Sequence, residues 1–595
     1  MRTIIPTDAV GDVELICDNP GAWTFDVSLK IEKGLEYLNL SLNAPSEAVP
    51  PCFTVSFAIP QQGIRHLWEI NSTVRFPLRP NWTAKRRTSI ASGMPLFAFL
   101  GDDDRNRLTV ASDEVFRELS YTMGIREEGC MIVGSLTWFS AAEAPRSSYS
   151  TTLCFDRRDI FWAETVTEAS LWMRKSAGCV AGTVPEAAYE PLYSTWYQYH
   201  QDVFAGPIER ECAIASPLGM KTVIVDDGWQ TDNTRRGYSW CGDWQVTQRR
   251  FPDMPGHVRR VKDMGMKYML WYAVPFVGNH SAAFNRFKEC FLYTERAPFD
   301  SKDDLTGVLD PRFPQVREYL IGLYVTAARE WGLDGFKLDF IDRFRLGRRK
   351  DPALKDNYAG RDVKTVPEGV NLLMCAVRDS LTRLNPDVLL EFRQGYVGPS
   401  ITAYGNMFRV SDCPGDACQN RVGICNLRIG APGIAIHSDM LEWHPSESAS
   451  EVARNIQSSI FGVIQYSVEL EKLPKEHLDV VKCWLDFSRR HRSALLKGWI
   501  KPHHPEAGYP LVEAGDGSET VKAVYHDGTV VPVASGQGPV YLINASSSGD
   551  VAVDFEREPG KISVYDYAGR KVQSCKAFNG LGRLPIPSGG WAEIR

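Results

Sequence analysis

The sequence predicts an α/β protein: a (β/α)8 TIM barrel flanked by an N-terminal antiparallel β-sandwich and a small C-terminal β-domain. Three observations predict this class. Short apolar runs with period-two alternation fill the first 180 residues, eight apolar runs alternate with helical stretches between 190 and 495, and a β pattern returns after 500. We therefore predict domains at 1–180, 190–495 and 500–595 of the 595-residue chain.

The two outer segments share one kind of pattern. Apolar and polar residues alternate between regularly spaced turn residues, which indicates antiparallel strands that bury one face. In the first segment such runs are clearest at 23–29, 53–57, 108–110 and 130–133. Residues 175–191, with Gly, Pro and Ala, are typical of a linker. After 500 the strands are expected at 521–525, 540–543, 562–567 and 591–594.

The middle segment predicts parallel strands joined by helices. The strands are expected at 192–196, 222–225, 268–271, 335–338, 388–392, 407–410, 434–437 and 462–466. Helical periodicity appears between most of them, at 258–264, 314–331, 370–384 and 449–459. Eight βα units over a segment of this length are typical of a (β/α)8 barrel.

Charge and composition exclude some classes of partner. The net charge is −6, and the sequence has no long basic run, so we expect neither nucleic acid nor an anionic membrane surface as a partner. Pro6 and Asp8 interrupt the N-terminus before an apolar stretch forms, which argues against a signal peptide. The 14 cysteines lack zinc-type spacing. We therefore predict a cytoplasmic protein.

The predicted barrel strands deliver polar and aromatic side chains to one rim. The active site of such a barrel lies at the C-terminal ends of its strands. The side chains found there are Trp196, Asp226, Asp227, Trp271, Lys337, Asp339, Glu391, Arg393, Asp412, His437 and Asp439. A single Asp after a strand is commonly a helix cap. Several carboxylates beside Trp, Lys and Arg instead fit glycoside cleavage, which needs one nucleophilic and one proton-donating carboxyl group.

These strings resemble glycoside hydrolase family 36, the α-galactosidase and raffinose-synthase group. The resemblance rests on Asp226-Asp227-Gly228-Trp229-Gln230, Lys337-Leu338-Asp339 and Ser411-Asp412 with Asp416 close behind, and it spans about 190–470. It implies a retaining exo-α-glycosidase, without cofactor or metal, that acts on an oligosaccharide or glycoside. By the resemblance Asp339 is the nucleophile and Asp412 is the general acid/base. We expect a less polar setting to raise the pKa of Asp412.

The resemblance also implies a set of substrate-binding residues. Asp226 and Asp227 are expected to grip the outer hydroxyls of the sugar, unless one of them caps the following helix. The remaining members of the set are Trp196 and Trp271 in the pocket wall, with Arg312, Lys337, Arg393 and Asp416. Asp342 is a rival nucleophile by position, and we interpret it as a residue that stabilises the loop.

Arg393 departs from the family pattern, which has a small residue there. Its guanidinium is expected to bind a 2-substituent or an acidic group, or to pair with Glu391 or Asp412. Arg393 therefore leaves two alternatives open, a clan relative that acts on α-glucosides and a transglycosylase. A non-catalytic carbohydrate-binding protein is a further alternative, although all the carboxylates that catalysis needs are present. A metal site built from His437, Asp439 and Asp226 is a weaker alternative, because no metal-ligand motif supports it. Self-association into a homo-oligomer is also left open.

Overall fold

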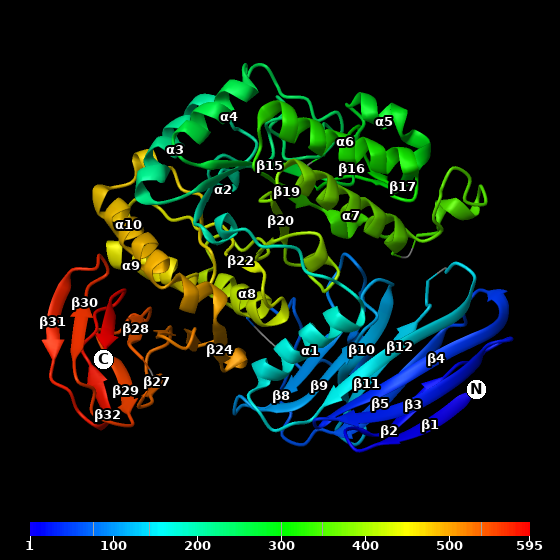
Figure 1. The fold of residues 1–595 in the computed structure, drawn as a ribbon, viewed down its shortest axis with the longest axis horizontal. Coiled ribbons are helices and arrows are strands. Elements are labelled where there is room, and N and C mark those ends of the chain that lie inside the picture. The colour runs from blue at the N-terminus through cyan, green and yellow to red at the C-terminus, as the bar shows by residue number, and fades with distance from the viewer. Residues whose placement is uncertain (75–76, 142, 299, 348, 537) are drawn as a thin grey trace.

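The computed structural model describes residues 1–595 apart from 75–76, 142, 299, 348 and 537. Figure 1 shows the N-terminal sheets in blue to cyan, the barrel in green to yellow, and the C-terminal sheets in orange to red. The predicted fold class is confirmed, since a near-closed parallel barrel lies between two antiparallel-rich β regions. The predicted domain boundaries stay a prediction, because sheet membership alone does not establish which segments fold independently.

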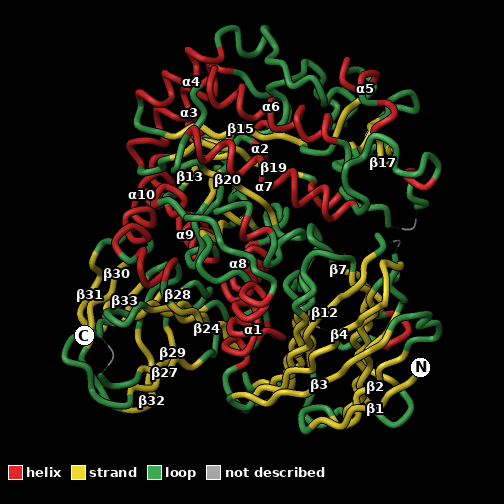
Figure 2. The backbone as a smooth tube through the Cα atoms, turned by 45° about the vertical axis from the view of Figure 1, so that its right-hand side comes forward, coloured by secondary structure: helices red, strands yellow, loops and turns green. Residues whose placement is uncertain are grey.

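Two six-stranded sheets form the N-terminal sandwich, visible as two layers in Figure 2. One sheet consists, in spatial order, of β1 (Arg2–Thr7), β2 (Gly11–Ile16), β5 (Phe53–Pro60), β11 (Met131–Trp138), β10 (Leu119–Arg126) and β7 (Lys85–Thr88). The other consists of β3 (Thr24–Glu32), β4 (Leu35–Ala48), β12 (Arg146–Asp156), β9 (Asn106–Ser112), β8 (Leu96–Leu100) and β6 (His66–Trp68). Alternate residues of these strands point inward and form one buried apolar cluster.

Eight parallel strands form the barrel sheet, and each predicted strand overlaps an observed one. In chain order they are β13 (Leu192–Ser194), β14 (Thr222–Val225), β15 (Lys267–Ala273), β19 (Gly335–Asp339), β20 (Leu389–Arg393), β21 (Met407–Arg409), β22 (Ala435–His437) and β23 (Gln465–Tyr466). Bridges from His437 to Val463 and from Leu441 to Tyr466 connect the last two strands and close the ring. The first strand ends earlier than predicted, since Trp196 already begins a helix.

Helices cover the outside of this sheet, as Figure 2 shows in red. They are α3 (Ala205–Leu218), α4 (Met254–Asp263), α6 (Pro314–Trp331), α7 (Val366–Leu384), α8 (Ala417–Gly430), α9 (Ala449–Ser458) and α10 (Lys475–Arg490). Two short helices, α2 (Trp196–Tyr199) and α5 (Ala282–Arg286), lie in the segments that follow β13 and β16. A small sheet of β16 (Phe276–Gly278), β18 (Thr306–Leu309) and β17 (Phe291–Glu295) extends the barrel after β15. In the described part of the chain, no helix combines the length and apolar character that a membrane span requires.

Two sheets form the C-terminal region. The larger consists, in spatial order, of β24 (Trp499–His503), β25 (Leu511–Gly515), β26 (Thr520–Val524), β28 (Val540–Asn544), β33 (Trp591–Ile594), β30 (Ile562–Tyr565) and β31 (Lys571–Cys575). The smaller consists of β27 (Val530–Val533), β29 (Val551–Phe555) and β32 (Gly580–Leu584). All four strands predicted after residue 500 overlap observed ones.

One helix lies in a segment where only strands were predicted. Helix α1 (Trp162–Ser176) follows the last strand of the sandwich and packs against β8, β9 and α8. The hydroxyl of Ser170 donates to the carbonyl of Gly430 at the end of α8. Helix α1 therefore joins the sandwich to the side of the barrel that carries the sixth strand, within a segment where the sequence pattern predicted only strands.

Candidate active site

Strand register brings the polar residues of the barrel into one layer. Trp271 of β15 pairs with Lys337 of β19, and Lys337 pairs with Glu391 of β20. One step further along, Arg393 of β20 pairs with Arg409 of β21. Because residues two apart on a strand face the same side, these side chains share the inner face of the barrel.

Asp339 ends β19 and its two carboxylate oxygens have different surroundings. Oδ1 accepts three hydrogen bonds, from Arg393 Nε at 2.8 Å, from the Tyr396 hydroxyl at 2.7 Å and from the Phe340 backbone N–H at 2.8 Å. Oδ2 accepts one longer bond, from Trp271 Nε1 at 3.2 Å. Oδ2 is therefore the oxygen with lone-pair capacity left for a substrate.

The charges around Asp339 keep it ionised. Burial raises the pKa of this carboxyl, but the cations of Arg393 and Lys337 and the Tyr396 hydrogen bond outweigh burial and hold the pKa well below its ordinary value. The pKa of Asp342, three residues later, is raised by burial, and its Oδ1 has no partner in the described residues. Asp339 is the better nucleophile of the two, because only it is stabilised as an anion.

Asp412 follows β21 and pairs with Arg409 of that strand. Its Oδ1 accepts a hydrogen bond from Arg409 Nη2 at 2.8 Å, and 52% of its side chain is exposed, against 10% for Asp339. Burial raises the pKa of the Asp412 carboxyl, but the charges of Arg409, Arg393 and Lys337 lower it by more. The pKa therefore lies below its ordinary value. The expected upward shift is thus wrong for the free protein, because three cations face this carboxyl.

Two residues without an assigned role in the sequence analysis hold Asp412 in place. Arg409 is buried and pairs with Asp439 through Nη1. Asp439 also accepts hydrogen bonds from the Tyr197 hydroxyl and the Cys413 backbone N–H, both at 2.6 Å. Asp439 therefore anchors both the Arg409 side chain and the loop that carries Asp412. Strand alternation could have identified Arg409 as a residue of the site. It lies in register with Arg393 on the neighbouring strand and therefore faces the inside of the barrel.

Asp226 and Asp227 are both nearly fully buried at the end of β14. Asp226 forms an ion pair with Lys337 Nζ at 2.6 Å. Asp227 accepts hydrogen bonds from Gln201 Nε2 and Gln230 Nε2, each at 2.6 Å, and burial raises its pKa to about 7. Each carboxylate is thus already held rigidly by a protein partner at the mouth of the barrel.

The remaining predicted binding residues occupy three different settings. Trp196 begins α2 and contacts the His200 ring edge to face at 4.8 Å. Asp416 is the N-cap of α8, where its Oδ1 accepts from the Gln419 backbone N–H at 2.8 Å. Trp271 stands beside Asp339, as described above.

Arg312, which the resemblance assigned to substrate binding, makes its polar contacts inside the protein. Its side chain is completely buried and pairs with both Asp310 and Asp351, at 2.8 and 2.7 Å. It donates further to the Lys364 carbonyl. With its guanidinium donors used inside the protein, Arg312 stabilises the segment after β18, and a role in substrate binding stays a prediction.

The three residues considered for a metal are each bound to protein groups. His437 Nε2 contacts the Ala188 carbonyl at 2.8 Å, and burial lowers the pKa of this imidazole to about 4. Asp439 pairs with Arg409, and Asp226 pairs with Lys337. In the described residues no group of three His, Cys, Asp or Glu side chains is arranged as a metal site.

Comparison with known proteins identifies the class. A (β/α)8 barrel with a pair of carboxylates at its C-terminal rim is the arrangement of a glycoside hydrolase. The family model described as Melibiase matches residues 190–498, which is more than half of the chain. The chain belongs to the Melibiase family.

Curated relatives are distant and match over part of their length. The chain is 23% identical over 316 residues to "Alpha-galactosidase Mel36A" of Lactobacillus acidophilus, covering 48% of this chain and 38% of that protein. It is 28% identical over 134 residues to "Alpha-galactosidase AgaA" of Geobacillus stearothermophilus, covering 22% of this chain and 18% of that protein. The matched segments thus span well under two thirds of either relative.

Solved structures extend the similarity of fold to the whole chain. The AgaA structure of Geobacillus stearothermophilus covers 100% of this chain and 82% of its own, with a TM-score of 0.63 and 16% identity. A variant of AgaA in complex with 1-deoxygalactonojirimycin gives a TM-score of 0.64, covering 98% of this chain and 83% of its own at 16% identity. At this identity the comparison establishes the shared fold.

Proposed function

We propose that this protein is a retaining exo-α-glycosidase, and specifically an α-galactosidase, with Asp339 as nucleophile and Asp412 as general acid/base. Membership of the Melibiase family supports the reaction class, and the relatives named as α-galactosidases support the sugar. The proposed substrate is an oligosaccharide or glycoside, because related structures are titled as complexes with raffinose and stachyose. We also propose a cytoplasmic location, supported by 14 free cysteines.

One observation carries the proposal: Arg393 and Arg409 pair in register on neighbouring strands, and each donates a 2.8 Å hydrogen bond to one carboxylate, Arg393 to Asp339 and Arg409 to Asp412. Because residues in register on neighbouring strands lie side by side, this arrangement supports two carboxyl groups that share one space at the barrel mouth. Retaining hydrolysis requires such a pair, with carboxyl groups about 5–5.5 Å apart.

The proposed mechanism has two displacements. Asp339 Oδ2 attacks the anomeric carbon, the bond to the leaving oxygen breaks, and Asp412 gives that oxygen its proton. In the second step Asp412 takes a proton from water, the water oxygen attacks the anomeric carbon, and the bond to Asp339 breaks. Asp412 must be protonated first, so we infer that a bound sugar raises its pKa by excluding water from this half-exposed carboxyl.

Residues around the pair are proposed to hold the sugar. Asp226 with Lys337 presents an acceptor and a donor, and Asp227 lies beside them, which suits the two outer hydroxyls of a pyranose. Trp196 and Trp271 supply apolar faces for the ring. Since galactose and glucose differ at one of these hydroxyls, a site built to bond it rejects the wrong epimer.

Assays with nitrophenyl α-galactoside and nitrophenyl α-glucoside test the proposed sugar. We expect faster hydrolysis of the galactoside, and proton NMR should detect the α anomer of galactose as the first product. The Asp339→Ala variant should lose turnover by at least about 1000-fold while it folds normally. An initial β anomer, or wild-type turnover by Asp339→Ala, would overturn the mechanism.

A second candidate is hydrolysis of another α-glycoside. The chain is also 28% identical over 133 residues to "Alpha-xylosidase" of Emericella nidulans, covering 21% of this chain. Arg393 favours this alternative too, because its guanidinium reaches the mouth with 22% of the side chain exposed. Faster cleavage of α-glucoside or α-xyloside than of α-galactoside would support it, and transfer to an added sugar acceptor would identify a transglycosylase.

A further inference from the structure

A cavity lies at the boundary between the N-terminal sandwich and the barrel. Its volume is about 490 Å³, within the range of small-molecule sites. Most of its walls come from β6, β7, β10 and the segments next to them, and Arg345 comes from the loop after β19. Arg87 of β7 spans the boundary, since its Nη1 donates to Glu118 Oε1 at 2.7 Å and to the Gly347 carbonyl at 3.3 Å. The cavity therefore has walls from both the sandwich and the barrel.

The described lining of this cavity is strongly basic. It carries one carboxylate, that of Glu69, against five cationic side chains, namely Arg79, Lys85, Arg86, Arg87 and Arg345. Glu69 is already engaged, because its Oε1 accepts a hydrogen bond from the Tyr121 hydroxyl at 2.5 Å and its Oε2 lies 3.9 Å from Arg86 Nε. Within the described residues, no group forms a hydrogen bond or an ion pair with the guanidinium of Arg79 or of Arg345. A recess lined by one sign of charge attracts the opposite charge, so this lining indicates an anionic ligand.

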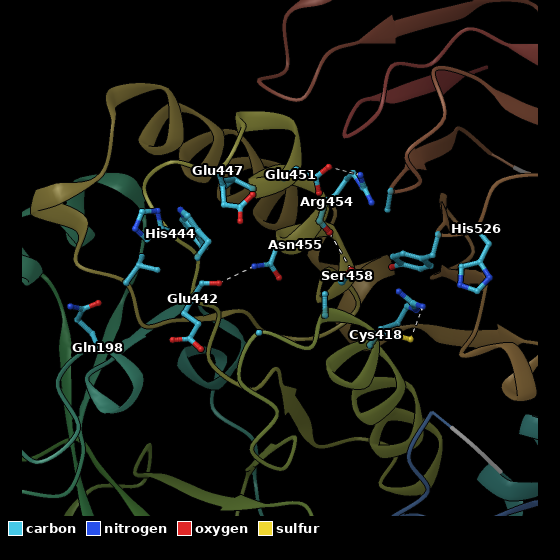
Figure 3. A pocket seen from close by; sticks show the side chains of 18 residues that line it. Gln198, Cys418, Glu442, His444, Glu447, Glu451, Arg454, Asn455, Ser458 and His526 are labelled. Carbon is cyan, nitrogen blue, oxygen red and sulfur yellow. Dashed lines mark hydrogen bonds and ion pairs between the residues drawn. The ribbon is translucent and has the colours of Figure 1, made fainter. Parts of the chain in front are cut away.

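A cavity of about 760 Å³ beside α8 and α9 differs from this one in charge. Figure 3 shows Glu442, Glu447 and Glu451 among its walls, and Glu451 pairs with Arg454 at 2.7 Å. Arg421, which also lines it, donates to a backbone carbonyl and lies over an aromatic ring. Its unpaired carboxylates disfavour an anion, so an anionic ligand is expected to prefer the cavity at the sandwich.

The basic cavity also contacts the segment that positions the proposed nucleophile. Asn71 Oδ1 accepts a hydrogen bond from the Gly395 backbone N–H at 3.1 Å, and the Gly93 backbone N–H donates to the Gly395 carbonyl at 3.1 Å. Asn71 and Gly93 both line the cavity. Gly395 lies in the segment after β20 that carries two side chains bonded to Asp339. A ligand in the cavity would therefore contact residues that hold this segment in place.

We propose that this cavity binds a phosphate group, either as free phosphate or as part of a phosphorylated sugar, between Arg79 and Arg86 of the sandwich and Arg345 of the barrel. Guanidinium groups bind phosphate oxygens through paired, charge-assisted hydrogen bonds, which favours phosphate over a neutral ligand. The bound anion connects the sandwich to the barrel. The assignment goes beyond the proposed glycosidase function and does not depend on it, because binding is measured without turnover.

Titration of inorganic phosphate, and separately of glucose 6-phosphate, tests the proposal by calorimetry. Sodium chloride at about 0.15 M screens non-specific attraction between exposed charges. We expect the wild type to bind phosphate, and Arg79→Met and Arg345→Met each to bind it about tenfold more weakly, since they remove cations from opposite walls. The matched control Arg126→Met removes an exposed arginine of the sandwich outside the cavity lining and should bind as the wild type does.

Tighter binding of glucose 6-phosphate than of phosphate, with the same dependence on both arginines, would support a phosphorylated sugar as the ligand. Equal affinity would support free phosphate. A wild type that binds neither probe, or equal affinity in the wild type and both cavity variants, would overturn the site. Equal weakening by Arg126→Met would overturn it as well, because only net charge would then matter. Failure of the proposed function is visible separately, as a protein that binds phosphate but cleaves no α-glycoside.

Discussion

At the scale of single residues, Arg393 determines how the proposed nucleophile behaves. It donates Nε to Asp339 Oδ1 at 2.8 Å and lies over the rings of Phe340 and Tyr396. Its ion pair therefore engages one carboxylate oxygen and leaves Oδ2 for the sugar. The sequence analysis expected Arg393 to pair with Glu391 or Asp412 or to bind substrate, and the pairing with Asp339 follows from the register of β19 and β20.

Substitution of Arg393 should move the acid limb of the pH–rate profile. Arg393 is the largest favourable influence on the Asp339 anion, and burial works against that anion. Removing the cation raises the pKa of Asp339. As the pH falls, the Arg393→Met variant should therefore lose activity at a higher pH than the wild type does. We expect a shift of about one pH unit or more in kcat/KM on an aryl glycoside. The control variant Arg126→Met alters an exposed arginine and should leave the acid limb unchanged. An acid limb of Arg393→Met that does not move either would contradict the role of Arg393 in lowering the pKa of Asp339.

Removal of the Asp412 carboxyl should affect substrates according to their leaving groups. An activated aryl leaving group needs little protonation, whereas a sugar alcohol needs a proton from the acid. Asp412→Ala should therefore lose about 100-fold or more on raffinose and much less on a nitrophenyl glycoside. Steady-state kinetics on both substrates measure this difference. Equal losses would mean that Asp412 is not the proton donor.

At the scale of elements, α8 begins directly after the acid/base loop, and Asp416 is its N-cap. The resemblance implied that Asp416 binds substrate, whereas its Oδ1 caps the helix. Asp416→Ala should cost about 1 kcal/mol of stability, and Asp416→Ser, which keeps a cap, should restore most of it. Thermal unfolding and KM distinguish the two roles. If Asp416→Ser folds as wild type but loses substrate affinity, Asp416 also binds the sugar.

Elements with a strong local pattern were predicted well. Helix α6 was predicted with its observed bounds, since Pro314 at its start and Gly332 after its end are local signals. Helix α1 was missed although Trp162, Val166 and Met173 show helical spacing and are buried. The surrounding strands dominated the interpretation there, and only packing against β8, β9 and α8 distinguishes this helix.

At the scale of the whole molecule, His503 joins the two β regions. It bonds Asp104, in the turn between β8 and β9, at 2.9 Å and Glu513 of β25 at 3.0 Å. Burial lowers the pKa of this imidazole, but the two carboxylates outweigh burial and raise the pKa to about 9. The protonated His503 therefore stabilises contact between the N-terminal and C-terminal sheets (Figure 1).

This contact should make stability depend on pH. The pKa of histidine in an unfolded chain is about 6.5, so the stabilisation is complete below that pH and is lost as the pH rises through about 9. At pH 6, His503→Ala should be less stable than wild type by at most about 3 kcal/mol. The difference should shrink by pH 10, as measured by chemical unfolding. A difference that does not change with pH would refute the ion-pair interpretation.

The sequence by itself determined the fold class, the order of the eight barrel strands and the family motifs with Asp339 and Asp412. These depend on local hydrophobic period and on short strings, which a single stretch of chain contains. Only the tertiary structure decided which charged groups pair. Arg312 is buried with Asp310 and Asp351. Arg393 forms an ion pair with Asp339, and Asp439 forms one with Arg409. Such partners come from distant elements, and no local pattern encodes which charged groups the packing of the barrel brings within hydrogen-bonding distance.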